Sequence, residues 1–192
     1  MLLAVLADAG LSLADLDALA VARGPGSFTG IRTGLAAARG LALVTRLPVF
    51  APTTLEVLVR PLLGDVADCR SVGALLDARR GQVYWQLFTS SGAPADAPRV
   101  IAPAAVAAEL RRSLAAPVRL AGSGAKLVLP LLRGLDAEMA DVSLDAAAVA
   151  LTAEAMASRG EAAIDAASLV PLYLRGADAR PDAGRALLDV GG

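Results

Sequence analysis

Short apolar runs alternate with longer, helix-like apolar segments through the first third of the chain. A short apolar run between turn signals is typical of a strand buried on both faces, whereas a longer run is typical of a helix. The predicted elements are a helix over 1–9, a strand over 16–22, a helix over 29–45, a strand over 48–51 and a helix that begins at Thr53 or Thr54. Strands separated by helices predict a parallel α/β layer.

From residue 71 the pattern changes to a period of two. The segments 71–77 and 82–89, joined by a short turn, predict a β-hairpin. Trp85 falls on one face of the second strand and Tyr84 and Phe88 on the other, which favours core packing on both sides over a base-stacking surface. The remaining predicted elements are a strand over 99–101, a helix over 103–115, a strand over 118–121, a helix over 127–133 and a helix from Ser143 or Asp145 to 158.

The change of pattern also divides the chain into parts. A length of 192 residues allows one large domain or two small lobes with a core each. We expect a first lobe over 1–66, a second lobe over 67–175 and a C-terminal tail over 176–192, with the lobe boundary between Pro61 and Arg70.

Charge and composition exclude several classes of site. Eighteen basic and nineteen acidic residues nearly cancel, so the chain lacks the positive field typical of a protein that binds tRNA by itself. Histidine is absent and Cys69 is the single cysteine, which excludes Ser-His-Asp and Cys-His catalysis, histidine or paired-cysteine zinc sites, and disulfides within the chain. We expect Cys69 to be a small buried hydrophobe in a reducing compartment.

The apolar segments do not predict a membrane protein. The N-terminus lacks the basic region of a signal peptide. The longest weakly charged run, 33–47, contains Arg39 and is too short to cross a bilayer. The sequence predicts a soluble, cytoplasmic protein without a membrane partner.

Four glycines and a proline lie close together between the predicted strand 16–22 and the first turns of the predicted helix 29–45. Glycine allows backbone conformations that other residues rarely adopt, and Ser27 or Thr29 can cap the helix that follows. Together with Gly24 and Gly26, these residues form a candidate anion-binding turn, because the N–H groups of a helix N-terminus bind phosphates. A purely structural turn is the alternative. The glycine spacing differs from that of a dinucleotide site, and the lysine of a phosphate loop is missing.

The predicted helix 29–45 is apolar nearly all round, which favours burial on more than one side. Its two charged residues, Arg32 and Arg39, are seven positions apart and lie on one narrow stripe. Small residues at a spacing of four form a groove that lets another helix approach closely. The candidate partner-binding residues are the groove residues Gly30, Gly34 and Ala38, together with Arg32 and Leu41. The alternative is that the groove receives the chain's own helix 1–9.

Two other groups have a functional and a structural explanation. Asp77, Arg79 and Arg80 at the predicted hairpin tip can bind a carboxylate or phosphate, or can form a solvated turn with a weak surface ion pair. The tripeptide Gly122-Ser123-Gly124 is similar to a second nucleotide-fold turn, although two glycines in a loop are a weak signal.

The stretch from Gly24 to Arg32, GPGSFTGIR, closely resembles a signature of the TsaB family, also called YeaZ. The motif is long and unusual, which makes it specific. The resemblance continues through Gly40, Pro48 and the segments 53–56, 77–84, 122–124 and 171–175. It therefore covers nearly the whole chain.

The resemblance implies an α/β, actin- and sugar-kinase-like (ribonuclease H-like) fold with two small lobes. Family members usually begin with a strand, a phosphate turn and a β-meander, and by comparison this chain starts inside the helix that follows. We therefore expect an N-terminally truncated version of the fold.

The resemblance also implies a function. The implied function is that of a non-catalytic partner subunit of the TsaD enzyme, which makes threonylcarbamoyladenosine in tRNA. The implied partners are a TsaD homologue, the ATPase TsaE and a second copy in a homodimer, with tRNA contacted only indirectly. No cofactor is implied for the chain alone. Whether ATP binds at an interface of the complex stays open.

Two alternatives stay open at this point. One is a nucleotide-binding enzyme of the actin and sugar-kinase class, which needs acidic residues that hold magnesium beside a phosphate turn. The other is a glycoprotease-like peptidase, which the lack of histidine and of a metal-ligand cluster disfavours. Since no catalytic group is complete in the sequence, we expect no catalytic activity from the chain alone.

Overall fold

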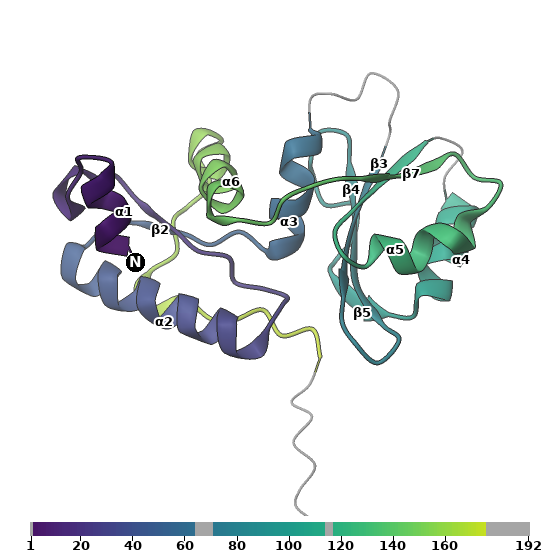
Figure 1. The fold of residues 1–192 in the computed structure, drawn as a ribbon, viewed down its shortest axis with the longest axis horizontal. Coiled ribbons are helices and arrows are strands. Elements are labelled where there is room, and N and C mark those ends of the chain that lie inside the picture. The colour runs from purple at the N-terminus through teal and green to yellow at the C-terminus, as the bar shows by residue number, and fades with distance from the viewer. Residues whose placement is uncertain (1, 64–70, 114–116, 176–192) are drawn as a thin grey trace, which may run out of the picture.

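The computed structural model describes residues 2–63, 71–113 and 117–175, which form two β-sheets with helices packed around them (Figure 1). The predicted mixed α/β class is confirmed, because each sheet pairs strands that are separated by helices. Cys69 and the predicted tail 176–192 lie outside the described residues.

The small sheet consists of β1 (Leu19–Ala20) and β2 (Val49–Phe50), which pair in parallel as the alternating pattern predicts. α2 (Phe28–Thr45) connects the two strands and packs against β1. A short helix, α1 (Leu2–Asp8), and a 3-10 turn, η1 (Leu13–Asp15), precede them. The buried core around this sheet consists of Leu35, Ala38, Ala42, Val49, Ala51 and Leu169.

The large sheet has five strands in the order β5-β4-β3-β6-β7. Its strands are β3 (Ser71–Asp77), β4 (Val83–Thr89), β5 (Arg99–Ile101), β6 (Val118–Ala121) and β7 (Ala137–Ala140). β3 and β4 form the predicted antiparallel hairpin, whereas β6 and β7 continue the sheet in parallel on the other side of β3.

Helices cover both faces of the large sheet. α3 (Thr54–Val59) lies on one face, and α4 (Pro103–Ser113) and α5 (Ala125–Val128) lie on the other (Figure 1). Trp85 is 1% exposed and packs with α4 and α5, whereas Phe88 is fully buried beside α3. The predicted division of these aromatic side chains between two faces is therefore confirmed.

α3 packs against the large sheet and against α6 (Ala146–Ser158), which in turn packs against the small sheet. The first turn of α3 is closed by a capping box, in which the Glu56 N–H donates to Thr53 Oγ1 at 3.1 Å and the Thr53 N–H donates to Glu56 Oε2 at 2.7 Å. Leu55, Val57 and Leu58 are at most 1% exposed, because the helix packs against β3 on one side and α6 on the other.

The chain returns to the small sheet after the large one is complete. Asp145 caps α6 by accepting a hydrogen bond from the Ala148 N–H, and α6 packs against β1, β2 and α3. The 3-10 turn η4 (Ala166–Ser168) then packs against α2. The lobe division 1–66 and 67–175 stays a prediction, and this packing places α6 and η4, both within the predicted second lobe, beside first-lobe elements.

Two elements differ from the sequence prediction for clear physical reasons. β7 was not predicted, because its residues alternate weakly and Asp136 and Asp141, which flank it directly, are polar. The predicted helix 127–133 is instead α5 followed by the 3-10 turn η3 (Leu129–Leu132), since Pro130 has no N–H to donate to the preceding turn.

The turn after β6 brings the chain unusually close to β3. Gly122 has a φ of +97°, and a Cβ at this position would lie 2.3 Å from the Leu75 carbonyl oxygen and 2.7 Å from Leu58 Cδ1. Both the backbone conformation and the lack of space require glycine here. The predicted glycine turn 122–124 therefore has a packing role in the fold.

We expect Gly122→Ala to lower the free energy of unfolding by about 1–3 kcal/mol more than Gly134→Ala, because overpacking adds to the strain of a positive φ. Gly134 is a matched control, since it has a φ of +85° and a Cβ there would meet no atom within 4 Å. Urea unfolding of both variants measures the difference. Equal losses in the two variants would contradict the close contact with Leu75.

Candidate functional site

The glycine turn is fixed by backbone hydrogen bonds to three other segments. The Arg23 N–H donates to the Pro52 carbonyl at 3.0 Å, the Thr54 N–H donates to the Gly24 carbonyl at 2.9 Å, and the Leu172 N–H donates to the Arg23 carbonyl at 2.8 Å. Gly24 has a φ of +104° and is buried, and the peptide bond that follows it is cis. The three backbone hydrogen bonds therefore fix the direction in which α2 begins.

The start of α2 lines a cleft between the two sheets. Ser27 caps the helix, because its Oγ accepts a hydrogen bond from the Gly30 N–H at 3.4 Å. Gly26 and Ser27 line a cleft of about 780 Å³, and Thr29 is exposed to solvent. The opposite walls are formed by the end of β3, the hairpin turn and the first turn of α6.

The charges in this cleft do not favour an anion. Its charged lining residues are Asp77, Arg79 and Asp145, two carboxylates against one guanidinium. The Ala148 N–H and the Ser143 hydroxyl lower the pKa of Asp145 below its usual value, so this carboxylate stays ionised at neutral pH. The anion-binding prediction for Gly24, Gly26, Ser27 and Thr29 stays untested, and the geometry favours the structural alternative.

The predicted cluster at the hairpin tip forms a local turn. Asp77 accepts a hydrogen bond from the Arg79 N–H at 2.7 Å, and its carboxylate lies 3.8 Å from the Arg79 guanidinium, which is 87% exposed. Such an exposed pair contributes little to stability. Among the described residues, His, Cys, Asp and Glu side chains nowhere gather in groups of three that could hold a metal ion.

The predicted partner-binding residues of α2 point in different directions. Gly30 and Arg32 are exposed and Leu41 is half-buried. Gly34 faces the small sheet, because a Cβ there would lie 3.7 Å from Val21 Cγ2, and Ala38 is 8% exposed in the core. The groove of small residues therefore faces the chain's own strand and core along most of its length, and its role in partner binding stays untested.

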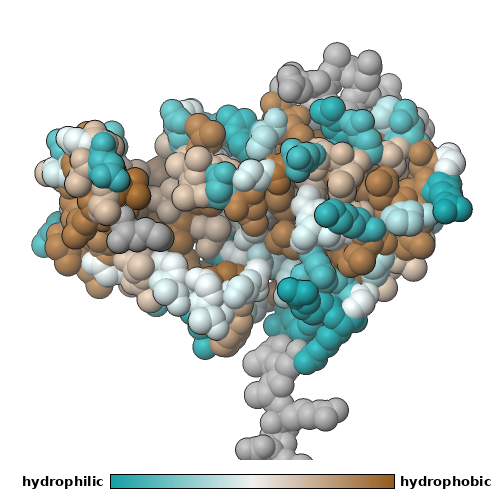
Figure 2. All heavy atoms as spheres, viewed as in Figure 1, coloured by the Kyte–Doolittle hydropathy of each residue, from teal (hydrophilic) through white to brown (hydrophobic). Residues whose placement is uncertain are grey.

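The opposite face of α2 carries the exposed apolar surface. Thr33, Ala36, Ala37, Gly40, Leu43 and Val44 form this outward face, and all six are exposed. Leu43 is 73% exposed and Val44 is 84% exposed. Figure 2 shows apolar side chains gathered over the end of the molecule that carries α1 and the last turns of α2. In the sequence, this face is marked by the absence of charged residues at the six positions.

The two arginines of α2 bind the chain's own C-terminal part, which confirms that they share one stripe. Arg39 donates to the carbonyls of Ala166 and Ala167, at 3.1 Å from Nε and 3.3 Å from Nη2. Arg32 donates from Nε to the Tyr173 hydroxyl at 2.7 Å, and its guanidinium lies 3.8 Å from the centre of the Phe28 ring. Residues 166–175, here called the C-terminal strap, therefore run along α2.

The strap ends on the large sheet. Arg175 donates from Nη1 to the Ala78 carbonyl at 3.1 Å and from Nη2 to Gln82 Oε1. Both acceptors belong to the turn between β3 and β4, whereas Leu172 is bonded to the glycine turn of the small sheet. The strap thus spans the two walls of the cleft. In the sequence, 171–175 stands out only through the family resemblance.

Comparison with known proteins decides the family. A family model described as TsaD: tRNA N6-adenosine threonylcarbamoyltransferase matches residues 1–175. The tRNA threonylcarbamoyladenosine biosynthesis protein TsaB of Escherichia coli (strain K12) is 44% identical over 81 residues, which are 42% of this chain and 35% of that protein. A structure named YeaZ from Pseudomonas aeruginosa has a TM-score of 0.74 at 30% identity, covering 91% of this chain and 81% of that chain. The chain belongs to the TsaB/YeaZ family.

Another relative is similar over nearly the whole of this chain. An uncharacterized protein of Mycobacterium bovis is 35% identical over 181 residues, which cover 93% of this chain and 74% of that protein. The family and the actin-like fold predicted from the GPGSFTGIR motif are thereby confirmed. The match to Escherichia coli TsaB spans about a third of that protein's length. No helix in the described ranges is both long and apolar enough to cross a membrane.

We expect Arg175→Ala to lower the free energy of unfolding by about 1–3 kcal/mol, since a half-buried charged donor with two acceptors is lost. Amide hydrogen exchange should rise in the hairpin turn 78–82, and α2 should change little. Arg133→Ala is the control, because this exposed arginine lies on the same lobe away from the strap. Unchanged exchange in the turn would mean that the strap does not hold the hairpin.

Proposed function

We propose that this TsaB/YeaZ protein is a non-catalytic partner subunit of a TsaD complex that makes threonylcarbamoyladenosine in tRNA. The observation that carries this proposal is the match to the TsaD family model over 1–175 together with relatives named TsaB. A subunit role is supported by the position of the most exposed apolar side chains, which lie on a helix surface and outside the cleft.

The proposed contact for the TsaD homologue is the outward face of α2. Its side chains are small or apolar, and none of the six is charged, so a second helix can approach closely without desolvating a charge. Arg32 flanks this face on one side, and Gly30 and Leu41 flank it on the other. Gly34 and Ala38 support the contact from behind, by letting α2 lie close to its own sheet.

The remaining partners follow from this placement. A homodimer would use the same outward face and would compete with the TsaD homologue, whereas the ATPase TsaE would join the assembled complex. The net charge of −1 favours an indirect contact with tRNA. Because tRNA is modified where it is made and used, we propose a cytoplasmic location.

The nucleotide-binding alternative is less well supported. Its phosphates would lie in the cleft beside the start of α2, where Asp77 and Asp145 contribute negative charge. ATP at an interface of the assembled complex remains compatible with this arrangement, since a partner can supply the cations that the cleft lacks.

The proposal predicts that Gly40→Arg weakens binding of the cognate TsaD homologue by at least about tenfold, because a bulky charge would be buried in an apolar contact. A Cβ at Gly40 meets no atom within 4 Å and arginine favours a helix, so the variant should fold normally. Titration calorimetry measures the affinity, and circular dichroism checks the fold.

Ala108→Arg is the matched control, because Ala108 is an exposed small residue in the middle of α4 on the other lobe. It should bind the TsaD homologue as the unaltered chain does. If Gly40→Arg binds with full affinity while the chain does bind the homologue, the contact lies elsewhere. If the unaltered, folded chain does not bind the homologue at all, the subunit role itself fails.

A further inference from the structure

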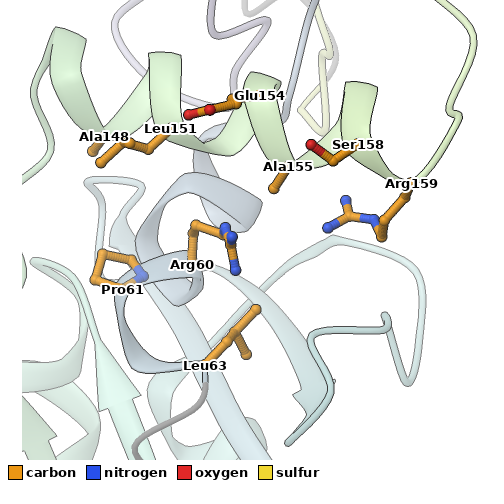
Figure 3. Close-up of a pocket in the computed structure, with 9 residues that line it drawn as sticks. All are labelled: Arg60, Pro61, Leu63, Ala148, Leu151, Glu154, Ala155, Ser158 and Arg159. Carbon is orange, nitrogen blue, oxygen red and sulfur yellow. The ribbon is translucent and has the colours of Figure 1, made fainter.

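A second groove lies away from the cleft and from the outward face of α2. It has a volume of about 610 Å³ and runs between α6 and the 3-10 turn η2 (Arg60–Leu62) that follows α3 (Figure 3). Pro61, Ala148 and Leu151 give one end an apolar lining (Figure 3). Leu151 is 59% exposed, so this part of α6 has apolar surface that the chain itself leaves uncovered.

The other end of the groove is lined by cationic and hydroxyl groups. Arg60 extends into it from η2, and Arg159 and Ser158 approach from the last turn of α6 (Figure 3). Arg159 is held by Glu161, whose Oε1 accepts from Nε at 2.9 Å and from Nη2 at 2.6 Å. The groove thus has an apolar end and a positively charged end.

Among the described residues that line this groove, Arg60 is the one with a buried side-chain nitrogen that lacks a hydrogen-bond partner. Its Nε is inaccessible to solvent and has no hydrogen-bond partner, and no ion pair to its guanidinium is formed within the described residues. Glu154 lines the same groove but forms no ion pair with Arg60. The two Nη atoms of Arg60 are not among the buried unpaired atoms, so they are the ones that a ligand can reach. A half-buried guanidinium without an ion pair among the described residues favours the binding of an anion, and its planar fork matches a carboxylate.

We propose that this groove binds an extended peptide segment of a partner protein, in which an acidic side chain is flanked by apolar ones. The charge count favours a single carboxylate: among the described residues Arg60 forms no ion pair, Arg159 is already paired with Glu161, and Glu154 adds a negative charge that opposes a dianion. The apolar end would cover Leu151, which a bare anion would leave exposed. This inference does not depend on the contact proposed for α2.

The test follows the Arg60 side chain directly in the full chain. The probe is the peptide acetyl-Leu-Asp-Leu-amide, and acetyl-Leu-Asn-Leu-amide is its uncharged counterpart. In nuclear magnetic resonance titrations we expect the Nε–Hε signal of Arg60 to shift with the acidic peptide in a saturable manner. The uncharged peptide should bind at least about tenfold more weakly, because it cannot form the charged hydrogen bonds.

Variants locate the interaction. Arg60→Gln should weaken binding of the acidic peptide at least about tenfold, whereas Arg46→Gln, at an exposed arginine that ends α2, should leave it unchanged. If Arg60→Gln does not fold, the signal of Arg60 in the unaltered chain still decides the question.

Three results would overturn the proposal. The first is an Arg60 signal that does not move at saturating acidic peptide. The second is equal affinity for the acidic and uncharged peptides. The third is inorganic phosphate binding as tightly as the acidic peptide, which would make the groove a site for small anions instead of a peptide groove.

Discussion

Three backbone hydrogen bonds around Gly24 determine how the parts of this molecule meet. They join the end of β1 to the segment after β2, to the first turn of α3 and to the C-terminal strap. Only a residue that tolerates a positive φ can present its carbonyl to Thr54 while the preceding Arg23 bonds to Leu172. The direction of α2, the entry into α3 and the course of the strap all start from this turn.

The two sides of α2 differ in what surrounds them. One side is buried against the small sheet and holds the strap through Arg32 and Arg39. The other side is free of charge and exposes Leu43 and Val44. A helix with apolar residues all round would be hard to keep soluble as a free surface, and here half of that surface is covered by the chain itself. The remainder is a narrow face that suits one helix of a partner.

Local patterns in the sequence predicted the elements better than their mutual contacts. β3, β5 and β6 have the predicted bounds, since period-two runs between turns depend only on neighbouring residues. The orientation of α2 was predicted less well, because spacing identifies a groove of small residues but not which side of the helix meets the sheet. The strap could not be predicted as a connection at all. The hydrogen bond that Arg32 Nε donates to the Tyr173 hydroxyl joins residues 141 positions apart, and 166–175 has no periodicity.

The burial of Trp85 has a consequence for how this protein can be observed. It is the single tryptophan of the chain and lies in the core between the large sheet, α4 and α5. Its fluorescence therefore reports on the environment of that core alone, and the emission would remain nearly constant if the small sheet and α2 were to separate first. A far-ultraviolet signal would register that earlier step, so disagreement between the two optical probes would reveal a partly unfolded species.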